Sequence, residues 1–122
     1  MPRVPISLNL ADSGDLTAAG GTSITLAPSG EDWVVLRMVV TCTGTTPEPT
    51  VNIYRSRESP ATLVEGTQSG LNDWSDSRLV VTAGESLIAV WEGGPPGARA
   101  TFRVEGLAVA SGTGLQILMR GV

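Results

Sequence analysis

The sequence predicts an all-β protein, an antiparallel β-sandwich of eight or nine short strands with a jelly-roll-like arrangement. Short runs in which apolar and polar residues alternate recur along the chain between turns, in keeping with 15 Gly and 8 Pro among 122 residues. No run has the periodicity from which we predict a helix, and connections too short for crossover helices imply antiparallel neighbours. With 41% hydrophobic and 16% charged residues, the chain fits a single sandwich domain over residues 1–122.

The first predicted strand lies within residues 1–10, a segment that is also a candidate N-terminal arm. Pro5 cannot donate a ladder hydrogen bond, which favours an edge position. Two interpretations stay open: an arm that pairs with a partner protein or a neighbouring subunit, or an edge strand of its own domain. The apolar side of this segment consists of Val4, Ile6, Leu8 and Leu10. A loop over 11–21 and a short strand over 22–27 are expected next.

The longest predicted strand covers residues 33–42. Its even positions are uniformly apolar, so we expect the even side to face the core and the odd side to be partly covered. Arg37 does not fit this pattern, and we expect its guanidinium to reach a carboxylate at the rim of the sheet rather than a ligand. The even positions are Val34, Leu36, Met38, Val40 and Cys42.

A strand over 51–54 and a short strand over 62–65 lead into a predicted long loop over 66–77, which bears Trp74. A loop of this length is often functional, although a loop that merely covers one end of the core is commoner. Asn72, Asp73 and Asp76 give a weak calcium signal, because they lack the EF-hand spacing and Asx-turn caps explain them equally well. Further strands are expected over 79–82 and 115–119.

A predicted hairpin joins residues 86–91 to residues 99–105 through a Gly- and Pro-rich turn at 93–97. Both sides of the first arm are largely apolar, which predicts a central strand. Ile88 and Val90 then need a cover, either the second sheet with a loop or a neighbouring subunit. On the second arm, Ala100, Phe102 and Val104 form one apolar side that we assign to the core.

Composition excludes several classes of function. The chain has a net charge of −4, a sequence pI near 4.6, no His and one cysteine, Cys42, and its eight basic residues are all Arg. Without His, neither a Ser-His-Asp or Cys-His catalytic centre nor a His-containing zinc site can form. The arginines are scattered and form no stripe that would bind phosphates. We therefore expect no enzyme activity, no cofactor or metal, and no direct nucleic-acid partner.

Neither a signal peptide nor a membrane span is predicted. The N-terminus lacks a long apolar run, and no stretch of 18 apolar residues occurs in the chain. We expect a soluble protein that is made in a cytoplasm and has no membrane partner.

Several stretches together resemble small structural proteins of tailed bacteriophages that infect GC-rich actinobacterial hosts. This group includes head decoration proteins and minor tail or head-fibre proteins. The resemblance covers residues 23–109 and includes the run Gly-Glu-x-Leu-x-x-x-Trp-x-Gly-Gly at 84–94. It carries no functional residue across. The other stretches that carry it are 28–33, 51–55, 66–70, 75–76 and 96–101.

The resemblance implies a sandwich that binds a virion surface, commonly as a homotrimer. We accordingly expect a capsid decoration protein, made in the host cytoplasm, that binds the major capsid protein on the outer surface of the virion and stabilises the head. The alternatives are a minor tail or head-fibre protein and a carbohydrate-binding sandwich, which should expose a flat aromatic platform. Candidate residues for contact with the capsid or a second subunit are Val4, Ile6, Leu8, Leu10, Trp74, Ile88 and Val90.

Overall fold

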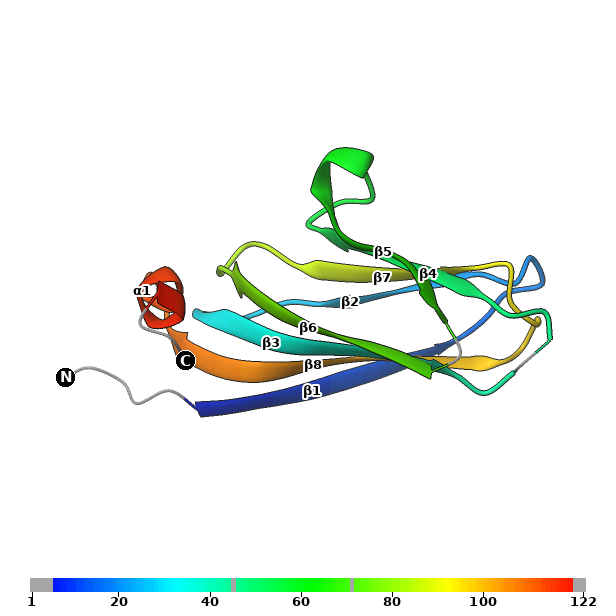
Figure 1. The fold of residues 1–122 in the computed structure, drawn as a ribbon, viewed down its shortest axis with the longest axis horizontal. Helices are drawn as coiled ribbons and strands as arrows, with labels where there is room; N and C mark the ends of the chain where they lie inside the picture. Colours follow the sequence, from blue (N-terminus) through cyan, green and yellow to red (C-terminus); the bar gives the residue numbers. More distant parts are fainter. Residues whose placement is uncertain (1–5, 45, 71, 120–122) are drawn as a thin grey trace.

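A computed structural model describes residues 6–44, 46–70 and 72–119 of the chain (Figure 1). It confirms the all-β prediction, because eight strands form two four-stranded antiparallel sheets that pack face to face. Within the described residues, helical structure is confined to a 3-10 turn, η1 (Pro60–Thr62), and a short helix, α1 (Gly114–Met119).

The strands follow the order β1-β8-β3-β6 in one sheet, termed sheet A, and β2-β7-β4-β5 in the other, termed sheet B. The pairs β1–β8, β2–β7, β3–β6 and β4–β5 are nested, as in an eight-stranded jelly roll. Sheet A consists of β1 (Ile6–Asp15), β8 (Arg99–Ala110), β3 (Glu31–Cys42) and β6 (Asn72–Val81). Sheet B consists of β2 (Thr22–Leu26), β7 (Leu87–Glu92), β4 (Thr50–Arg55) and β5 (Leu63–Ser69).

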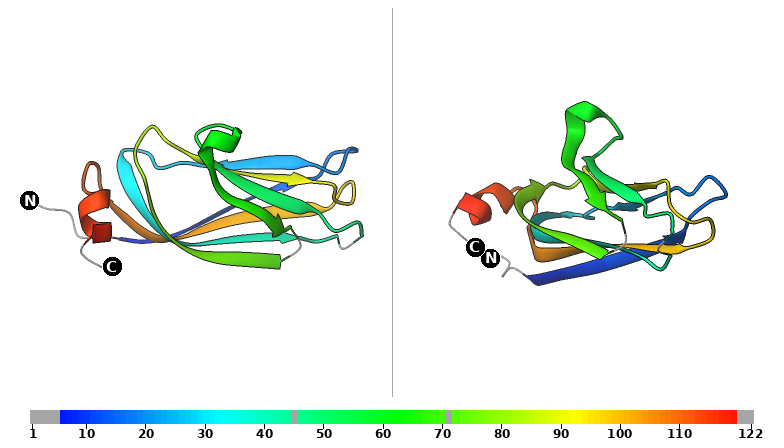
Figure 2. Two further views of the ribbon diagram at one scale, coloured as in Figure 1. Left: turned by 45° about the horizontal axis from the view of Figure 1, so that its top comes forward. Right: turned by 45° about the vertical axis from the view of Figure 1, so that its right-hand side comes forward.

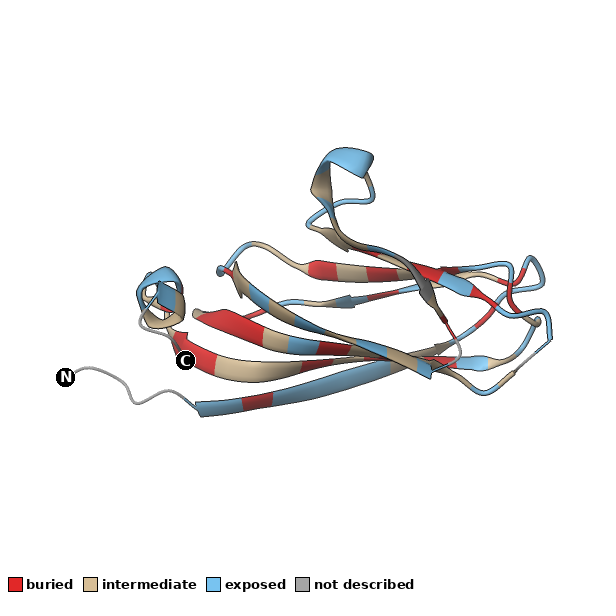
Figure 3. Cartoon of the chain, in the orientation of Figure 1, coloured by how far each residue is buried: buried red, intermediate tan, exposed pale blue. Residues whose placement is uncertain are grey.

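Large apolar side chains from both sheets fill the space between them. Buried residues accordingly lie on strands of both sheets (Figure 3). Trp33 and Phe102 of sheet A and Trp91 of sheet B are at most 1% exposed. The indole Nε1 of Trp91 donates a hydrogen bond to the carbonyl oxygen of Gly70 at 3.2 Å, so this buried polar group is satisfied. The assignment of Phe102 to the core is confirmed.

The predicted hairpin over 86–105 is wrong. β7 pairs with β2 and β4 in sheet B, whereas β8 pairs with β1 and β3 in sheet A, so the segment between them crosses from one sheet to the other. The crossing is tight, since a Cβ atom on Gly94 would lie 2.5 Å from Cδ2 of Leu16. Core-facing strands show the same alternation whether they pair with each other or face each other across a sandwich. The prediction that β7 is a central strand is confirmed.

The register of β3 shifts between Val35 and Arg37, which makes Leu36 the extra residue of a β-bulge. Odd-numbered residues face the core up to Val35, and even-numbered residues do so from Met38 onwards. The predicted even core side is therefore right only for the second half of the strand. Leu36 is half-buried, and Val34 is buried on the opposite, outer side of the sheet.

The predicted loop over 66–77 is also wrong, because these residues form the end of β5 and most of β6. β6 is an edge strand with alternating exposed and half-buried side chains, many of them polar. An edge strand of this composition lacks the apolar alternation by which strands are recognised. Trp74 thus lies on a strand of sheet A. β4 and β5 form a hairpin of sheet B, and the turn with η1 between them projects from the sandwich (Figure 2).

Residues 114–119 form α1 instead of the predicted last strand. Asp32 is only 2% exposed, and its Oδ2 accepts hydrogen bonds from the N–H groups of Gly112 and Gly114, each at 3.0 Å. At the other end, Arg78 donates from Nη2 to the carbonyl oxygen of Leu118 at 2.9 Å. An anion at the start of a helix and a cation at its end are both favourable. α1 packs on β3 and β6 and covers one end of the outer side of sheet A.

β1 pairs with β8 along its whole length, from Ile6 opposite Ala108 to Asp15 opposite Arg99. Residues 6–10 therefore form part of an edge strand of the domain's own sheet, in agreement with the second interpretation of the N-terminal segment. The strand also extends into the region that was predicted to be a loop. Val4 lies outside the described residues.

Candidate recognition surface

The outer side of sheet A, which is turned away from sheet B, is here called the sheet A face. Ala100, Phe102 and Val104 of β8 point into the core, so the alternate residues of this strand point outward. The paired strands align these outward residues, Thr101, Arg103 and Glu105, with those of their neighbours into rows. From β6 to β1, one row is Asp76, Arg37, Glu105 and Asn9. The next row is Trp74, Val39, Arg103 and Ala11, and a third is Asn72, Thr41, Thr101 and Ser13.

Trp74 is the large aromatic side chain of this face and is 55% exposed. The guanidinium carbon of Arg37 lies 4.6 Å from the centroid of its ring, within the range of a cation–π contact. Nε of Arg37 also donates to Oδ1 of Asp76 at 3.3 Å. Each contact is weak at an exposed site, but together they hold the guanidinium against the indole. The prediction that Arg37 reaches a carboxylate is confirmed.

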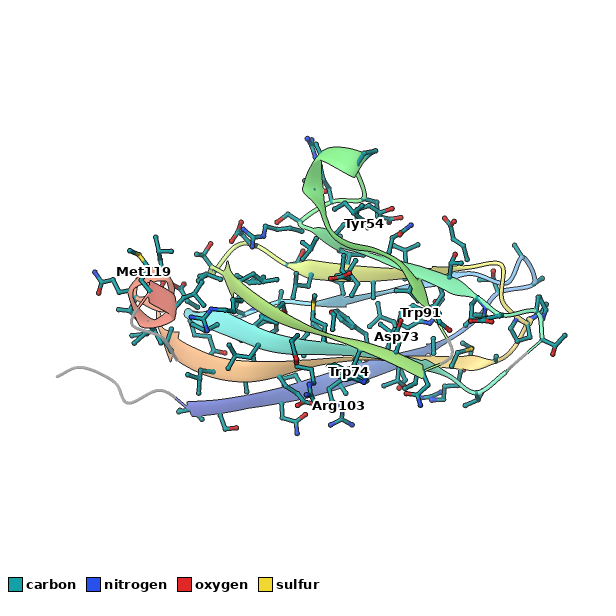
Figure 4. The ribbon with its side chains drawn as sticks, viewed as in Figure 1. Tyr54, Asp73, Trp74, Trp91, Arg103 and Met119 are labelled. Atoms are coloured by element: carbon teal, nitrogen blue, oxygen red, sulfur yellow. The ribbon has the colours of Figure 1, made fainter. Side chains whose placement is uncertain are left out.

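Arg103 lies beside Trp74 on the same face, with Val39 between them (Figure 4). Its Nη1 donates to Oδ1 of Asn9 on β1 at 2.8 Å. Among the described residues, the carboxylate of Glu105 has no hydrogen bond or ion pair, although Arg37 is its cross-strand neighbour. One row of the face therefore alternates in charge, from Asp76 through Arg37 to Glu105, and the Glu105 carboxylate can still accept hydrogen bonds.

The residues predicted from the sequence to make contacts fall into three separate places. Trp74 lies on the sheet A face. Ile88 and Val90 are half-buried on the outer side of sheet B, here called the sheet B face, beside Tyr54. Ile6, Leu8 and Leu10 lie on β1, where Leu8 is buried and the other two are exposed. The structure does not bring these three groups together.

Sequence reasoning missed Arg103, Asn9 and Glu105 as members of the face. The alternation on β8 did show that Arg103 and Glu105 point away from the core. Their position beside Trp74 depends on two facts that single-strand patterns do not contain, namely that β8 pairs with β3 and that residues 72–81 form a strand.

Other parts of the described chain provide weaker evidence for a binding site or a metal site than the sheet A face does. No group of three or more Cys, Asp or Glu residues there could hold a metal ion. Asp73 lies within β6 and accepts a hydrogen bond from the backbone N–H of the next residue, Trp74, at 2.8 Å, so the turn-cap interpretation of this residue is wrong. A shallow hollow of about 280 Å³ lies at the turn end of the β4–β5 hairpin, between Arg55 and Leu63. It holds no cluster of ionisable groups.

Neither of the helical segments in the described residues is long and apolar enough to cross a membrane.

No protein-family model matches this chain, and no curated protein matches it. Among solved structures, it is similar to the metallopeptidase IMPa from Pseudomonas aeruginosa, both alone and in complex with an O-glycopeptide. These alignments have 16% and 13% identity and a TM-score of 0.32. They cover 96% and 98% of this chain but only 15% of the metallopeptidase chain. A similarity at this level carries no functional argument.

Proposed function

We propose that this chain is a head decoration protein of a tailed bacteriophage, which binds the outer surface of the capsid through the sheet A face and stabilises the head. The proposal is carried by one observation: Trp74 is exposed on the sheet A face, and Arg37 contacts both its ring and the carboxylate of Asp76. The sequence resemblance to small phage structural proteins supports it. The jelly-roll topology, which viral capsid domains share with lectins, supports it by analogy.

The composition of the sheet A face suits a protein partner. Trp and Arg are the residues that most often dominate the energy of protein interfaces. Arg37 is already held by Trp74 and Asp76, so less side-chain freedom is lost when a partner binds. The charged row allows a partner to be selected by complementary charges.

The mechanism follows from the symmetry of a capsid. A preformed sandwich adds contact area between neighbouring capsid subunits, and many weak contacts on one lattice combine by multivalency. The expected partner is the major capsid protein. The homotrimer implied by the resemblance stays a prediction, and it competes with the dimer proposed below, so one measurement of the mass in solution decides between them.

A binding experiment with heads that lack the protein tests this proposal. Purified protein is mixed with such heads and pelleted, and the bound fraction is measured against concentration. Trp74→Ala is expected to raise the dissociation constant by about tenfold or more, as for a central interface aromatic. Tyr54→Ala, an aromatic change on the sheet B face, is the matched control and should bind like the wild type. Equal binding of the Trp74→Ala variant, or no binding of the wild type, would contradict the proposal.

The same experiment separates capsid from tail. Isolated tails without heads are tested beside heads without tails. Binding to tails alone would favour the minor tail or head-fibre alternative, in which the same face contacts a different virion protein.

A carbohydrate ligand is the second candidate, because Trp74 exposes an indole on a flat sheet face beside Asn9 and Arg103. Such a ring could stack on a sugar. Against it stand the guanidinium of Arg37, which occupies one side of the ring, and the lack of a second aromatic side chain in the three rows. Glycan-array binding that is lost in Trp74→Ala, together with no binding to heads, would support this candidate instead.

A further inference from the structure

The free edge of sheet A is formed by β1, whose first half lacks the usual protection of an edge strand. All ten residues of β1 pair with β8 in one uninterrupted register, so the strand has no bulge. Residues 6–11 contain no proline and no charged side chain, whereas Asp12, on the core-facing side, and Asp15 place negative charge in the rest of the strand. Natural edge strands are commonly protected by exactly such features, because their unpaired N–H and C=O groups can pair with another strand.

Exposed apolar side chains lie along this edge. Ile6 is 59% exposed and Leu10 is 44% exposed, whereas Leu8 between them is 5% exposed. Most of β1 is exposed (Figure 3). All three share the core-facing side of β1, since they pair with the inward positions of β8. The strand of sheet B that contacts β1 is β2, which has only five residues. Sheet B therefore leaves Ile6 and Leu10 uncovered.

We propose that β1 pairs antiparallel with β1 of a second copy of this chain, about a two-fold axis at Leu8. In this register Leu8 faces its own copy, and Ile6 of each subunit faces Leu10 of the other. On the outer side, Ser7 faces Asn9. Directly opposed residues of antiparallel strands point to the same side, so apolar residues meet on the core side and polar residues on the outer side.

Neighbouring registers are less favourable. A slip of one residue would place apolar side chains opposite polar ones that point to the other side of the sheet. With the axis at Asn9, Asp12 would face Ile6, and with the axis at Leu10, Asp12 would face Leu8. Only the axis at Leu8 pairs both exposed apolar residues and keeps Asp12 and Asp15 outside the paired residues 6–10. The edge pattern is therefore self-complementary, which argues for a second copy as the partner.

The pairing has a structural consequence. It joins two four-stranded sheets into one continuous eight-stranded sheet, and it places two sheet A faces side by side on one surface. The inference is independent of the proposed function, because it concerns the edge of sheet A and not its face.

Sedimentation equilibrium of the full chain over a range of concentrations tests the assembly. We expect a mass that rises to twice that of the monomer, and Leu10→Lys should raise the dimer dissociation constant by about tenfold or more, since it changes two symmetry-related contacts. Leu63→Lys, at an apolar residue of β5 that is 46% exposed, is the matched control and should leave the dimer intact. Far-ultraviolet circular dichroism verifies that both variants are folded. The proposal would be overturned by a monomer at all concentrations, by a trimer, or by a dimer whose dissociation constant Leu10→Lys does not change.

Disulfide cross-linking tests the register. In a Cys42→Ala background, the pair Ser7→Cys and Asn9→Cys should form an intermolecular disulfide on mild oxidation, because opposed residues lie within bridging distance. The pair Ser7→Cys and Ala11→Cys matches the register with the axis at Asn9 and should cross-link much less. Stronger cross-linking of the second pair would contradict the proposed axis.

Discussion

The two outer faces of this sandwich differ although the same fold produces both. On the sheet A face, Trp74 is exposed and Arg37 bridges it to a carboxylate. On the sheet B face, Ile88 and Val90 are half-buried among short polar neighbours such as Thr25, and the charged residue of β7 on that side is Glu92, opposite Thr50. The sheet A face thus exposes an aromatic ring and an ion pair, whereas the sheet B face centres on half-buried aliphatic side chains. This difference indicates which face is available to a partner.

The largest expected effect comes from a core substitution, because loss of the fold disrupts both faces. Phe102→Ala empties a fully buried position between the sheets and should lower the free energy of unfolding by about 3 to 5 kcal/mol. Chemical denaturation measures the change, and head binding should fall in proportion to the unfolded fraction. A loss below about 1 kcal/mol would mean that the ring is not a core residue.

A change on the sheet B face should affect stability alone. Ile88→Ala removes half-buried methylene and methyl groups that pack beside Tyr54 and Thr25, which should cost about 1 to 2 kcal/mol. Binding of the folded protein to heads should be unchanged. Weaker binding at a temperature where the variant is fully folded would show that this face, too, contacts the capsid.

A change on the sheet A face should weaken binding to heads and leave the free energy of unfolding almost unchanged. Arg37→Glu places a third negative charge beside Asp76 and Glu105 and removes the contact with Trp74. Because these contacts are exposed, the free energy of unfolding should change by less than about 1 kcal/mol. Head binding should weaken by about tenfold or more. Thr25→Glu adds a charge to the sheet B face as a control, and an equal loss of binding in both variants would point to net charge instead of the site.

The smallest expected effect concerns the turn between β6 and β7, which belongs to neither face. Glu85 accepts hydrogen bonds from the backbone N–H and the hydroxyl of Thr82 at 2.9 and 2.8 Å, and Arg55 lies 3.8 Å away. The Thr82 backbone N–H, helped by the hydroxyl and by Arg55, lowers the pKa of this carboxyl below its ordinary value of 4.5.

A lowered pKa in the folded state stabilises the protein above the ordinary pKa, and this stability is lost as the pH falls through the folded value. Glu85→Gln should therefore be slightly less stable than the wild type near neutral pH, and the two should converge on acidification below pH 4.5. Thermal unfolding over this pH range measures the difference. A stability difference between the variant and the wild type that grows toward low pH would contradict this account of Glu85.

Alternation along single strands was enough to predict the sandwich, the core position of Phe102 and the central place of β7. It was not enough for three features that depend on other parts of the chain. The bulge at Leu36 reverses the two sides of β3, the segment after β7 crosses between sheets, and α1 is capped by the distant Asp32 and Arg78.

The candidate surface was predicted only in part, for related reasons. Arg37 was recognised because it interrupts an apolar strand, and its carboxylate partner was expected. Trp74 was placed in a loop, because residues 72–77 are polar and form an exposed edge. The approach of Trp74 to Arg103 follows from strand order, which no local pattern encodes.

Cryo-electron microscopy of heads decorated with the purified protein tests the central claim most directly. We expect density for the sandwich on the outer capsid surface, with Trp74, Arg37 and Arg103 at the contact and the sheet B face turned to solvent. Density in which Ile88 and Val90 meet the capsid while Trp74 points away would contradict the account, as would heads that carry no added density at saturating protein.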